Sequence, residues 1–226
     1  MILQAKNITK IYGKGQTAFV ALDRVSFSVA RGESVAIIGK SGSGKSTLMH
    51  VLAALDRVNS GTIACNSKDY ESLRASQLDG LRSKHFGFIF QQFFLNGRET
   101  VLENVLLPLK IAGVGYGARK KRALAALEAV DLTDKKNNRA TDLSGGQKQR
   151  AAIARALVND PEVIFADEPT GNLDSENGAR VEELLFSLNR KKGITLIIVT
   201  HDDDLAKKCD RQFYMKDGQL TEAKKK

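Results

Sequence analysis

Residues 39–47 read GKSGSGKST, and this stretch decides the fold. It matches the phosphate-loop pattern G-x-x-x-x-G-K-[ST] from Gly39 to Ser46. An apolar run rich in β-branched residues, 35–38, comes before it and predicts a strand. The apolar residues that follow at helical spacing are Leu48, Val51, Leu52 and Leu55. The stretch is therefore a strand-to-helix turn whose backbone N–H groups and helix dipole suit a polyphosphate.

Two side chains of this loop carry specific chemistry. Lys45 is expected to reach the β- and γ-phosphates of a nucleotide, and the Ser46 hydroxyl to supply one ligand to Mg²⁺. The predicted nucleotide-binding residues of the loop are Gly39, Lys40, Ser41, Gly42, Ser43, Gly44, Lys45, Ser46 and Thr47. The loop by itself indicates a nucleotide and leaves the function open.

Two further apolar runs, 163–166 and 196–199, have the same short and unalternated character. Such runs are typical of strands that are covered on both faces of a parallel sheet. Because ligands bind beyond the carboxyl ends of parallel strands, we expect the loop, Asp167–Glu168 and His201 to converge at one edge.

The acid pair that ends the second run favours metal and base chemistry. Asp167 suits a role near Mg²⁺, because this hard cation prefers oxygen ligands and keeps several waters. Glu168 is then free to orient and deprotonate an attacking water. The alternative is a pair of solvated acids at the end of a strand.

Composition bounds the class of protein. The chain has 226 residues, 42% hydrophobic and 27% charged, which favours one globular domain with a subdomain. It has no run of 18 apolar residues and no apolar signal core near Met1, so we expect neither a membrane span nor secretion. Cys65 and Cys209 are isolated, and we interpret them as reduced. The net charge of +9 is scattered, with small clusters at Arg119–Arg122 and Lys224–Lys226; a solvated basic surface is favoured, and no nucleic acid is expected.

The organisation of the chain follows from its patterns. Phe19–Val29 and Ile63–Cys65 are predicted strands among turn signals such as Ser60-Gly61, which indicates a small antiparallel sheet. Residues from about 93 to 160 are mostly helical in pattern, and Leu124, Leu127 and Val130 form one apolar stripe. We therefore expect a core of about 1–92 and 161–226 with an inserted helical subdomain of about 93–160.

Residues 143–150 read LSGGQKQR, which resembles the signature motif of ATP-binding cassette (ABC) proteins. Ser144 and two glycines open a helix whose stripe is Ile153, Ala156 and Leu157, so N–H groups and the helix dipole face an anion. In the family this site binds the γ-phosphate of the nucleotide that the other subunit holds. The resemblance assigns this binding to Ser144, Gly145, Gly146 and Gln147.

The remaining motifs of the family occur in their usual order. Tyr12 resembles the aromatic residue that stacks on adenine, although a structural tyrosine is nearly as good an interpretation. Gln91, after FGFIF at 86–90, resembles the glutamine that senses Mg²⁺ and the attacking water. Asp174 resembles a loop residue that touches the opposite subunit, or else caps a helix. His201 resembles the switch histidine at the γ-phosphate, although a lone histidine is usually structural.

A finer resemblance points to the ATPase subunits of macrolide-export, lipoprotein-release and antimicrobial-peptide-resistance systems. It rests on ADEPTGNLD at 166–174, LENV at 102–105 and FQQF at 90–93. Two departures stand out. Lys148 replaces a common glutamine on a helix face that we expect to be exposed, and NGRE at 96–99 replaces apolar residues and a proline beside the surface where a membrane partner docks.

The resemblance implies an α/β fold: a P-loop NTPase core with a mainly parallel sheet, an N-terminal antiparallel β subdomain and an inserted helical subdomain. It implies an ATPase that uses ATP and Mg²⁺, forms a homodimer when ATP is bound, and drives a separate integral membrane permease, as an exporter or extraction system. The expected location is cytoplasmic, peripheral on the inner face of the cell membrane.

Two other function classes stay open. An ATP-driven regulatory clamp on a membrane complex, as in cell division, would use the same residues. A soluble DNA-repair or translation ATPase is less favoured, because such relatives carry a long coiled coil or two cassettes in one chain, and this sequence has neither.

Overall fold

The computed structural model describes residues 1–223, so the basic cluster Lys224–Lys226 lies outside the described residues. The chain divides into two compact units. The first unit is formed by residues 1–82 and 195–226, and the second unit by residues 83–194. Helix α2 (Ala75–His85) runs through the chain boundary between them.

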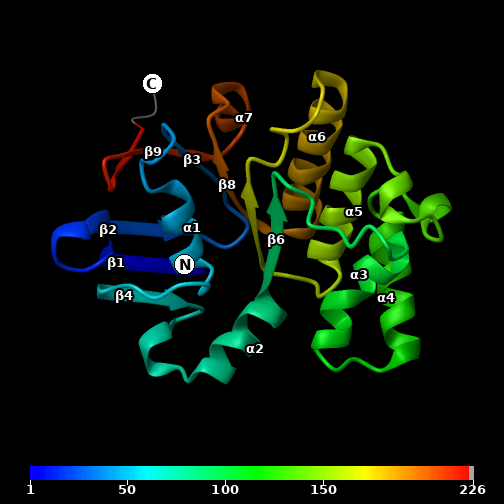
Figure 1. Ribbon diagram of the computed structural model, residues 1–226, viewed down its shortest axis with the longest axis horizontal. Coiled ribbons are helices and arrows are strands. Elements are labelled where there is room, and N and C mark those ends of the chain that lie inside the picture. The colour runs from blue at the N-terminus through cyan, green and yellow to red at the C-terminus, as the bar shows by residue number, and fades with distance from the viewer. Residues whose placement is uncertain (224–226) are drawn as a thin grey trace. The chain divides into compact units, whose positions relative to one another are not determined.

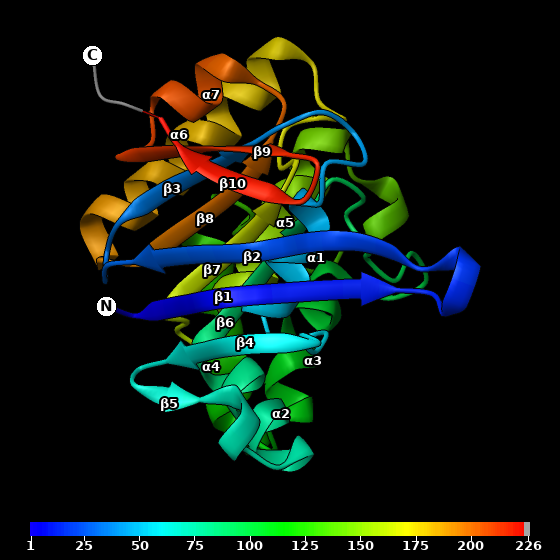
Figure 2. The ribbon, with the colours of Figure 1, turned by 90° about the vertical axis from the view of Figure 1, so that its left-hand side faces the viewer.

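An antiparallel sheet forms one layer of the first unit. Its strands are β1 (Leu3–Tyr12), β2 (Phe19–Val29), β4 (Ser60–Cys65) and β5 (Lys68–Asp69), in the order β2-β1-β4-β5 (Figure 2). The predicted antiparallel sheet is confirmed. The Ser60-Gly61 turn signal is wrong, because both residues begin β4. Gly61 has φ +87°, and a Cβ there would lie 2.4 Å from the Asn7 carbonyl oxygen, so the glycine serves a close approach of two strands and not a turn.

The second layer of the first unit is mainly parallel. Its strands are β3 (Ser34–Ile38), β8 (Thr195–Thr200), β9 (Arg211–Lys216) and β10 (Gln219–Glu222), in the order β10-β9-β3-β8. Strand β3 runs parallel to β8 and β9, and β10 pairs antiparallel with β9. Every residue of β3 and β8 is buried, which confirms that unalternated apolar runs form covered strands.

The helices of the first unit begin where the strands end. Helix α1 (Lys45–Leu52) follows the phosphate-loop stretch, and α7 (Asp203–Lys207) follows β8. The short 3₁₀ turns are η1 (Gly15–Thr17) and η2 (Tyr70–Ser72). Leu48, Val51 and Leu52 of α1 are buried as predicted. Leu55 lies beyond the end of α1 and is 47% exposed, so its place on the predicted helical stripe is wrong.

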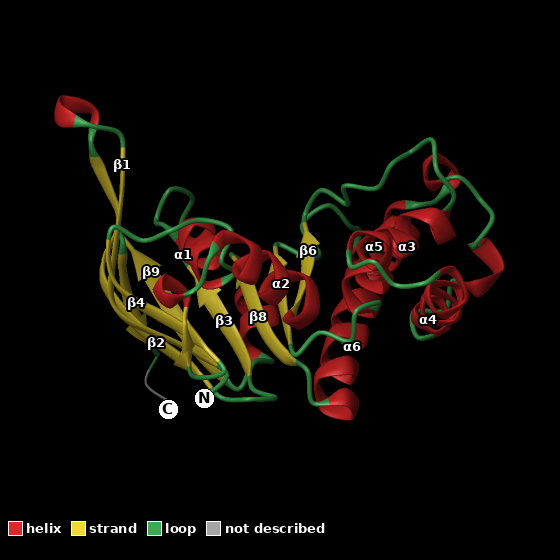
Figure 3. Ribbon diagram, turned by 90° about the horizontal axis from the view of Figure 1, so that it is seen from below, coloured by secondary structure: helices red, strands yellow, loops and turns green. Residues whose placement is uncertain are grey.

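The second unit pairs two strands and packs helices around them. Strand β6 (Phe86–Phe90) runs parallel to β7 (Val163–Asp167). The helices are α3 (Val101–Ile111), α4 (Tyr116–Glu128), α5 (Gly145–Leu157) and α6 (Ser175–Lys192), with 3₁₀ turns η3 (Thr133–Lys135) and η4 (Ala140–Asp142) (Figures 1 and 3). Helix α5 contacts α3, α4, α6 and β6, so it is the central helix of this unit.

The predicted helical content of residues 93–160 is confirmed, with one change in detail. Leu127 is buried on α4, and Val130 is also buried but lies after the helix, which ends at Glu128. Leu124 is half-buried. The apolar stripe therefore continues into the turn that follows α4.

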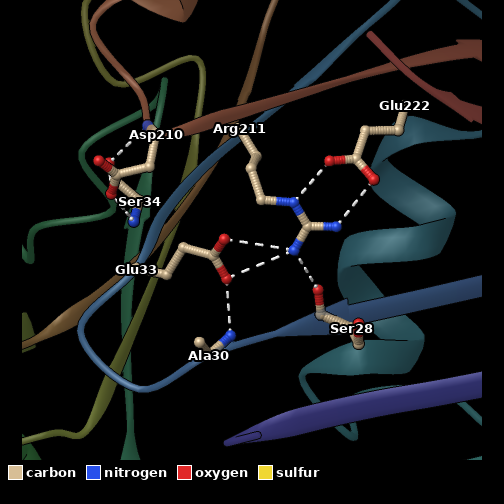
Figure 4. A network of polar contacts seen from close by, with 7 residues as sticks. All are labelled: Ser28, Ala30, Glu33, Ser34, Asp210, Arg211 and Glu222. Carbon is tan, nitrogen blue, oxygen red and sulfur yellow. Dashed lines mark hydrogen bonds and ion pairs between the residues drawn. The ribbon is translucent and has the colours of Figure 1, made fainter. Parts of the chain in front are cut away.

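A network centred on Arg211 ties together several elements of the first unit (Figure 4). The guanidinium donates two hydrogen bonds to Glu222, from Nε at 2.7 Å and Nη2 at 3.0 Å, and Nη1 donates to the Ser28 carbonyl oxygen at 2.9 Å and to Glu33 at 3.2 Å. The bonds to Glu222 raise the pKa of Arg211. Beside it, Asp210 accepts hydrogen bonds from Ser34, which fixes the start of β3 against the start of β9.

No helix among residues 1–223 is long and apolar enough to cross a membrane. Both cysteines, Cys65 and Cys209, are buried, and their reduced state stays a prediction.

Candidate functional site

The phosphate loop lies between β3 and α1, and two of its glycines are required by close backbone approach. A Cβ on Gly39 would lie 2.3 Å from the Met215 carbonyl oxygen of β9, and one on Gly44 would lie 2.5 Å from the Ala21 carbonyl oxygen of β2. Gly44 also has φ +107°, which side-chain-bearing residues rarely adopt. The loop therefore packs closely against β9 and β2.

Polar groups of the loop bond to one another and to the β9–β10 turn. Lys45 Nζ donates to the carbonyl oxygens of Gly39 at 2.6 Å and Lys40 at 2.9 Å, so the ammonium lies over the loop. The Ser43 carbonyl oxygen accepts a hydrogen bond from Gly218 N at 3.1 Å, at the β9–β10 turn. Ser43 Oγ is buried and has no hydrogen-bond partner among the described residues. A curled loop with an ammonium over it fits a polyphosphate.

A hollow of about 490 Å³ opens at this loop. Its volume lies within the range of small-molecule sites, about 300–1,000 Å³. Its lining comes from β2, the loop, α1 and the β9–β10 turn, and consists of Phe19, Val20, Ala21, Ser41, Gly42, Gly44, Lys45, Ser46, Thr47, Asp217 and Gly218. The loop residues thus line a space of suitable size for a nucleotide.

His201 lies at the same sheet edge as the loop. In the parallel register Ile38 pairs with Thr200, so Gly39 and His201 each follow the carboxyl end of neighbouring strands. The predicted convergence of the loop and His201 is confirmed within the first unit. His201 is exposed, and the turn after it is fixed by Asp202, whose side chain accepts hydrogen bonds from two backbone N–H groups of α7.

Tyr12 ends β1 and is held by its neighbours. Its hydroxyl donates to Asp56 Oδ2 at 2.7 Å, and Lys10 Nζ lies 4.8 Å from its ring centroid. Burial, and then the contact with Asp56, raises the pKa of Tyr12. Burial raises the pKa of Asp56, but the hydrogen bonds from Lys10 and Tyr12 outweigh it and leave that pKa lowered. These contacts leave the adenine-stacking role of Tyr12 a prediction.

Phe19 is a candidate that the sequence analysis missed. It pairs with Tyr12 across the β1–β2 hairpin, with ring centroids 5.7 Å apart, and it is 59% exposed. Unlike Tyr12, it lines the hollow at the loop. The only sequence signal was an aromatic residue at the start of a strand, which gives no information on the strand or loop that it faces.

The second unit brings Gln91 and the acid pair together. In the parallel register Phe90 pairs with Asp167, so Gln91 and Glu168 follow the same edge of the pair of strands. Gln91 exchanges hydrogen bonds with Asn172, from Nε2 to Asn172 Oδ1 at 3.2 Å and from Asn172 Nδ2 to the Gln91 carbonyl oxygen at 2.9 Å. The loop after the acid pair is therefore fastened to Gln91.

Glu168 has a strained backbone. Its φ is +47°, a left-handed conformation that costs a residue with a side chain about 1–2 kcal/mol. Its carbonyl oxygen accepts a hydrogen bond from Gly171 N at 3.1 Å, which closes a turn directly after the strand. Strain of this kind persists only where surrounding contacts hold it, and such positions cluster at functional sites. This supports, without testing, a catalytic role for Glu168.

The signature stretch opens α5 with a complete capping box. Ser144 Oγ accepts from Gln147 N at 3.3 Å, and Gln147 Oε1 accepts from Ser144 N at 3.0 Å. Ser144 and Gly145 are exposed, whereas Gly146 is buried against Asn177. The predicted stripe of Ile153, Ala156 and Leu157 is buried. The helix N-terminus thus faces outward, as an anion site requires, while its binding role stays a prediction.

Asp174 caps α6. Its Oδ1 accepts from Asn177 N at 2.9 Å and its Oδ2 from Asn177 Nδ2 at 2.7 Å, and these hydrogen bonds lower the pKa of Asp174. The helix-cap interpretation is confirmed. Contact with an opposite subunit remains a prediction for this exposed residue.

Lys148 and the NGRE stretch at 96–99, the two departures from the pattern of the similar export-type ATPases, have structural explanations. Lys148 is half-buried, so its predicted exposure is wrong; α5 is central and contacts other helices on several sides. Asn96 N donates to Asn104 Oδ1 at 2.7 Å, and Asn104 Nδ2 donates to the Asn96 carbonyl oxygen at 3.1 Å. The unusual turn is therefore fastened to α3, while Arg98 and Glu99 are exposed.

Comparisons with known proteins agree with these features. The family model described as ABC transporter matches residues 22–171. An uncharacterized ABC transporter ATP-binding protein of Methanocaldococcus jannaschii is 46% identical over 221 residues, 98% of each chain. The macrolide export ATP-binding/permease protein MacB of Chlorobaculum tepidum is 44% identical over 225 residues, 100% of this chain. The chain spans 34% of that MacB protein.

Solved structures give the same result. A dimeric ATP-binding cassette in a post-hydrolysis state, bound to ADP and Pi, is 41% identical with a TM-score of 0.89, and 98% of each chain is covered. The cbiO1 protein of Clostridium perfringens, part of the ABC transporter complex cbiONQ, is 32% identical with a TM-score of 0.87, covering 97% of this chain and 86% of that one. The predicted fold class, α/β with a P-loop NTPase core, is confirmed.

Proposed function

The chain belongs to the ABC transporter family, and from this premise we propose that it hydrolyses ATP as a subunit that dimerises around two Mg-ATP and drives a separate membrane permease. The observation that carries the proposal is the curled loop 39–47 with Lys45 over it and a hollow of about 490 Å³ beside it. The predicted division into a core (about 1–92 and 161–226) and a helical subdomain (about 93–160) is part of this proposal.

The nucleotide site uses the loop for the triphosphate. Backbone N–H groups at the start of α1 and the Lys45 ammonium bind phosphate oxygens. Ser46, Gln91 and Asp167 are the proposed Mg²⁺ ligands, and their oxygen atoms match the preference of this cation. When bound, the cation neutralises charge on the β- and γ-phosphates.

Hydrolysis depends on three side chains. Glu168 takes a proton from the attacking water. Its backbone is held in a turn by the hydrogen bond from Gly171 N to the Glu168 carbonyl oxygen. Gln91 orients that water, and its amide is already fastened by Asn172. His201 contacts the γ-phosphate from the carboxyl end of β8, one strand from the loop.

The dimer completes each site. Ser144, Gly145, Gly146 and Gln147 open α5, and the exposed helix end offers N–H groups and a dipole to the γ-phosphate that the other copy holds. Asp174 lies at the exposed start of α6, where we propose that it touches the other copy. The support is that the similar ATP-binding cassette of known structure is dimeric.

The proposed partner is an integral membrane permease of an export or extraction system, with the chain peripheral on the inner face of the cell membrane. The name of the MacB relative joins an ATP-binding part to a permease, and the chain spans only part of that protein. We propose that this partner docks beside residues 93–100, with Phe93, Phe94 and Leu95 as an apolar floor. A regulatory clamp on a membrane complex would use the same surface, and a transport assay separates the two.

Glu168→Gln tests the catalytic assignment. The substitution keeps size and polarity but removes the base, so ATP binding is retained while turnover is lost. An ATP-dependent dimer is expected to accumulate, measured by gel filtration with and without ATP. Wild-type hydrolysis by Glu168→Gln would overturn the role of Glu168.

Three further substitutions separate binding from catalysis. Lys45→Ala weakens nucleotide binding because it removes a charge at the phosphates. His201→Ala binds ATP but turns over slowly, because its contact matters as charge redistributes in the transition state. Ser144→Arg binds nucleotide normally but fails to dimerise. Equal loss of affinity in all three would contradict the separate roles.

Charge reversal tests the docking surface. Phe93 to Thr100 follow Gln91, Phe94 is 62% exposed, and the exposed charges of Arg98 and Glu99 suit recognition of one partner. The double variant Arg98→Glu with Glu99→Arg keeps the ATPase activity of the isolated chain and weakens capture by the permease.

The matched control reverses the exposed i,i+4 pair of α6, Glu176→Arg with Arg180→Glu. This control keeps both ATPase activity and capture at the wild-type level. Unchanged capture of the Arg98→Glu, Glu99→Arg variant in a pull-down with the permease would refute the docking assignment and leave the catalytic one standing.

A further inference from the structure

Gln149 is a polar residue in the middle of the core of the second unit. It lies on α5, and its side chain is 0% exposed. Its Nε2 donates hydrogen bonds to two backbone carbonyl oxygens, those of Pro169 and, at 3.4 Å, of Phe90. Two acceptors at one end of the amide require the NH₂ group there, because the other end carries only an acceptor. The orientation of the amide is therefore determined by its neighbours.

The two carbonyls that Gln149 holds are significant because of the residues next to them. Phe90 directly precedes Gln91, and Pro169 directly follows Glu168. One amide group therefore bonds to the backbone beside both the water-orienting residue and the general base. Glu168 itself has the strained φ of +47°, which needs surrounding contacts to persist.

Helix α5 holds the segment after Gln91 as well. The Arg155 guanidinium donates to the carbonyl oxygens of Phe93 at 2.9 Å and Phe94 at 2.5 Å. Burial lowers the pKa of Arg155. The same helix thus binds the backbone on both sides of Gln91.

Close packing makes these bonds possible. A Cβ on Gly87 would lie 2.6 Å from the Ala156 carbonyl oxygen, so only glycine lets α5 approach β6 at this distance. Gln149 and Ala156 are seven residues apart and lie on the same face of α5. The helix that begins at the signature Ser144 is therefore pressed onto the strand that ends at Gln91.

We propose that Gln149 is a positioning residue for ATP hydrolysis, which transmits the position of the signature helix to Gln91 and Glu168 through the carbonyls of Phe90 and Pro169. The inference rests on the proposed function, because it needs those two residues to act on the attacking water. When a γ-phosphate engages the N-terminus of α5, the amide holds both loops in register with that helix. Gln149 contacts no substrate; it acts through its neighbours.

A burial cost supports a role beyond packing. Gln149 Oε1 is buried and accepts no hydrogen bond from the described residues. A methionine of similar shape removes this unpaired acceptor, but it also leaves the carbonyl oxygens of Phe90 and Pro169 without their donor, so a lower Tm is expected as well. The kinetic constants are therefore compared at a temperature where the variant is folded.

The test uses Gln149→Met and a matched control, Asn189→Leu. Asn189 is also a buried amide of the second unit, and its Nδ2 donates to the Ile194 carbonyl oxygen at 2.8 Å, away from the residues assigned to catalysis. For Gln149→Met we expect kcat to fall roughly 10- to 100-fold, as for a small misplacement of reacting groups, with the Kd for ATP within about twofold of wild type. For Asn189→Leu we expect a lower Tm and an unchanged kcat at a temperature where the variant is folded.

The outcomes distinguish the inference from the function beneath it. If the wild-type chain has no ATPase activity, both the proposed function and the inference about Gln149 are refuted. An active wild type with full kcat in Gln149→Met overturns the inference alone, and an equal fall of kcat in Asn189→Leu also overturns it, because the effect would then be general loss of structure. If Gln149→Met does not bind ATP, Gln149→Leu, which is also apolar and lacks the donors, replaces it and must show the same fall in kcat at unchanged Kd.

Discussion

The contact between the phosphate loop and β9 can be tested with a single methyl group. In Gly39→Ala the added Cβ lies 2.3 Å from the Met215 carbonyl oxygen and 2.7 Å from Ser43 Oγ. Because non-bonded carbon and oxygen atoms pack at about 3.4 Å, the loop and β9 must separate by about 1 Å. Overpacking of this size costs about 1–3 kcal/mol. At roughly 2–4 °C per kcal/mol for a chain of this length, the Tm is expected to fall by about 2–12 °C.

The same displacement weakens ATP binding. If the shifted loop loses one or two hydrogen bonds to phosphate, at about 1.5 kcal/mol each, the Kd rises roughly 10- to 100-fold. The assay is isothermal titration with ATP, with thermal denaturation on the same samples. Gly117→Ala is the control, since nothing lies within 4 Å of the added Cβ on α4. Alanine there is expected to be neutral or to stabilise by about 0.5–1 kcal/mol. A Gly39→Ala protein with wild-type Tm and Kd would refute this account of the loop.

Three other predictions follow from the structure. Burial raises the pKa of Cys209 from 9.0 to about 12, so between these pH values only the unfolded chain releases this proton. The free energy of unfolding therefore falls as pH rises from about 9 to 12, by at most ~1.4 kcal/mol per pH unit. Urea unfolding of Cys209→Ala should show a shallower fall. Arg211→Met should cost about 2–3 kcal/mol in urea unfolding, since it leaves the mostly buried carboxylate of Glu33 without its ion pair, and Glu33→Gln in that background should recover part of the loss. The chain has no tryptophan, so emission of Phe19→Trp should change on addition of ATP if this side chain lies beside the bound base, whereas emission of Tyr116→Trp should not; identical titrations would count against Phe19.

The prediction of the fold from sequence worked where local physics decides. The run 35–38 and the glycine spacing of 39–47 predicted a strand, a turn and a helix, and the structure has all three in those places. Ser144 and the two glycines after it predicted the start of a helix, which is confirmed by a complete capping box. These signals depend on neighbours within a few residues, so one sequence contains them.

The predictions were wrong where a contact with a residue far away in the sequence, or the end of a helix, overrode a local sequence signal. Gly61 was a turn signal, but its freedom serves the approach of Asn7, more than fifty residues earlier in the chain. Leu55 continued a helical pattern in sequence, but α1 had already ended. The periodicity of a sequence carries no information about which strand or helix packs against a given residue. The roles of Gly61 and Leu55 could therefore be seen only in the folded structure.

The sequence by itself predicted the chemistry of this protein: the loop 39–47, the acid pair at the end of β7 and the signature at the start of α5 are short strings whose residue types suit phosphate and Mg²⁺. Only the tertiary structure decided how some of these parts are held. Three such contacts join segments tens of residues apart. They are the hydrogen bond from Tyr12 to Asp56, the position of Phe19 at the phosphate loop, and the hydrogen bonds from Gln149 to the carbonyl oxygens of Phe90 and Pro169. The physical reason is that such contacts form only when folding brings distant segments together. For Gln149 the acceptors are backbone carbonyl oxygens, which every residue type supplies, so no pattern of side chains marks which one will be used.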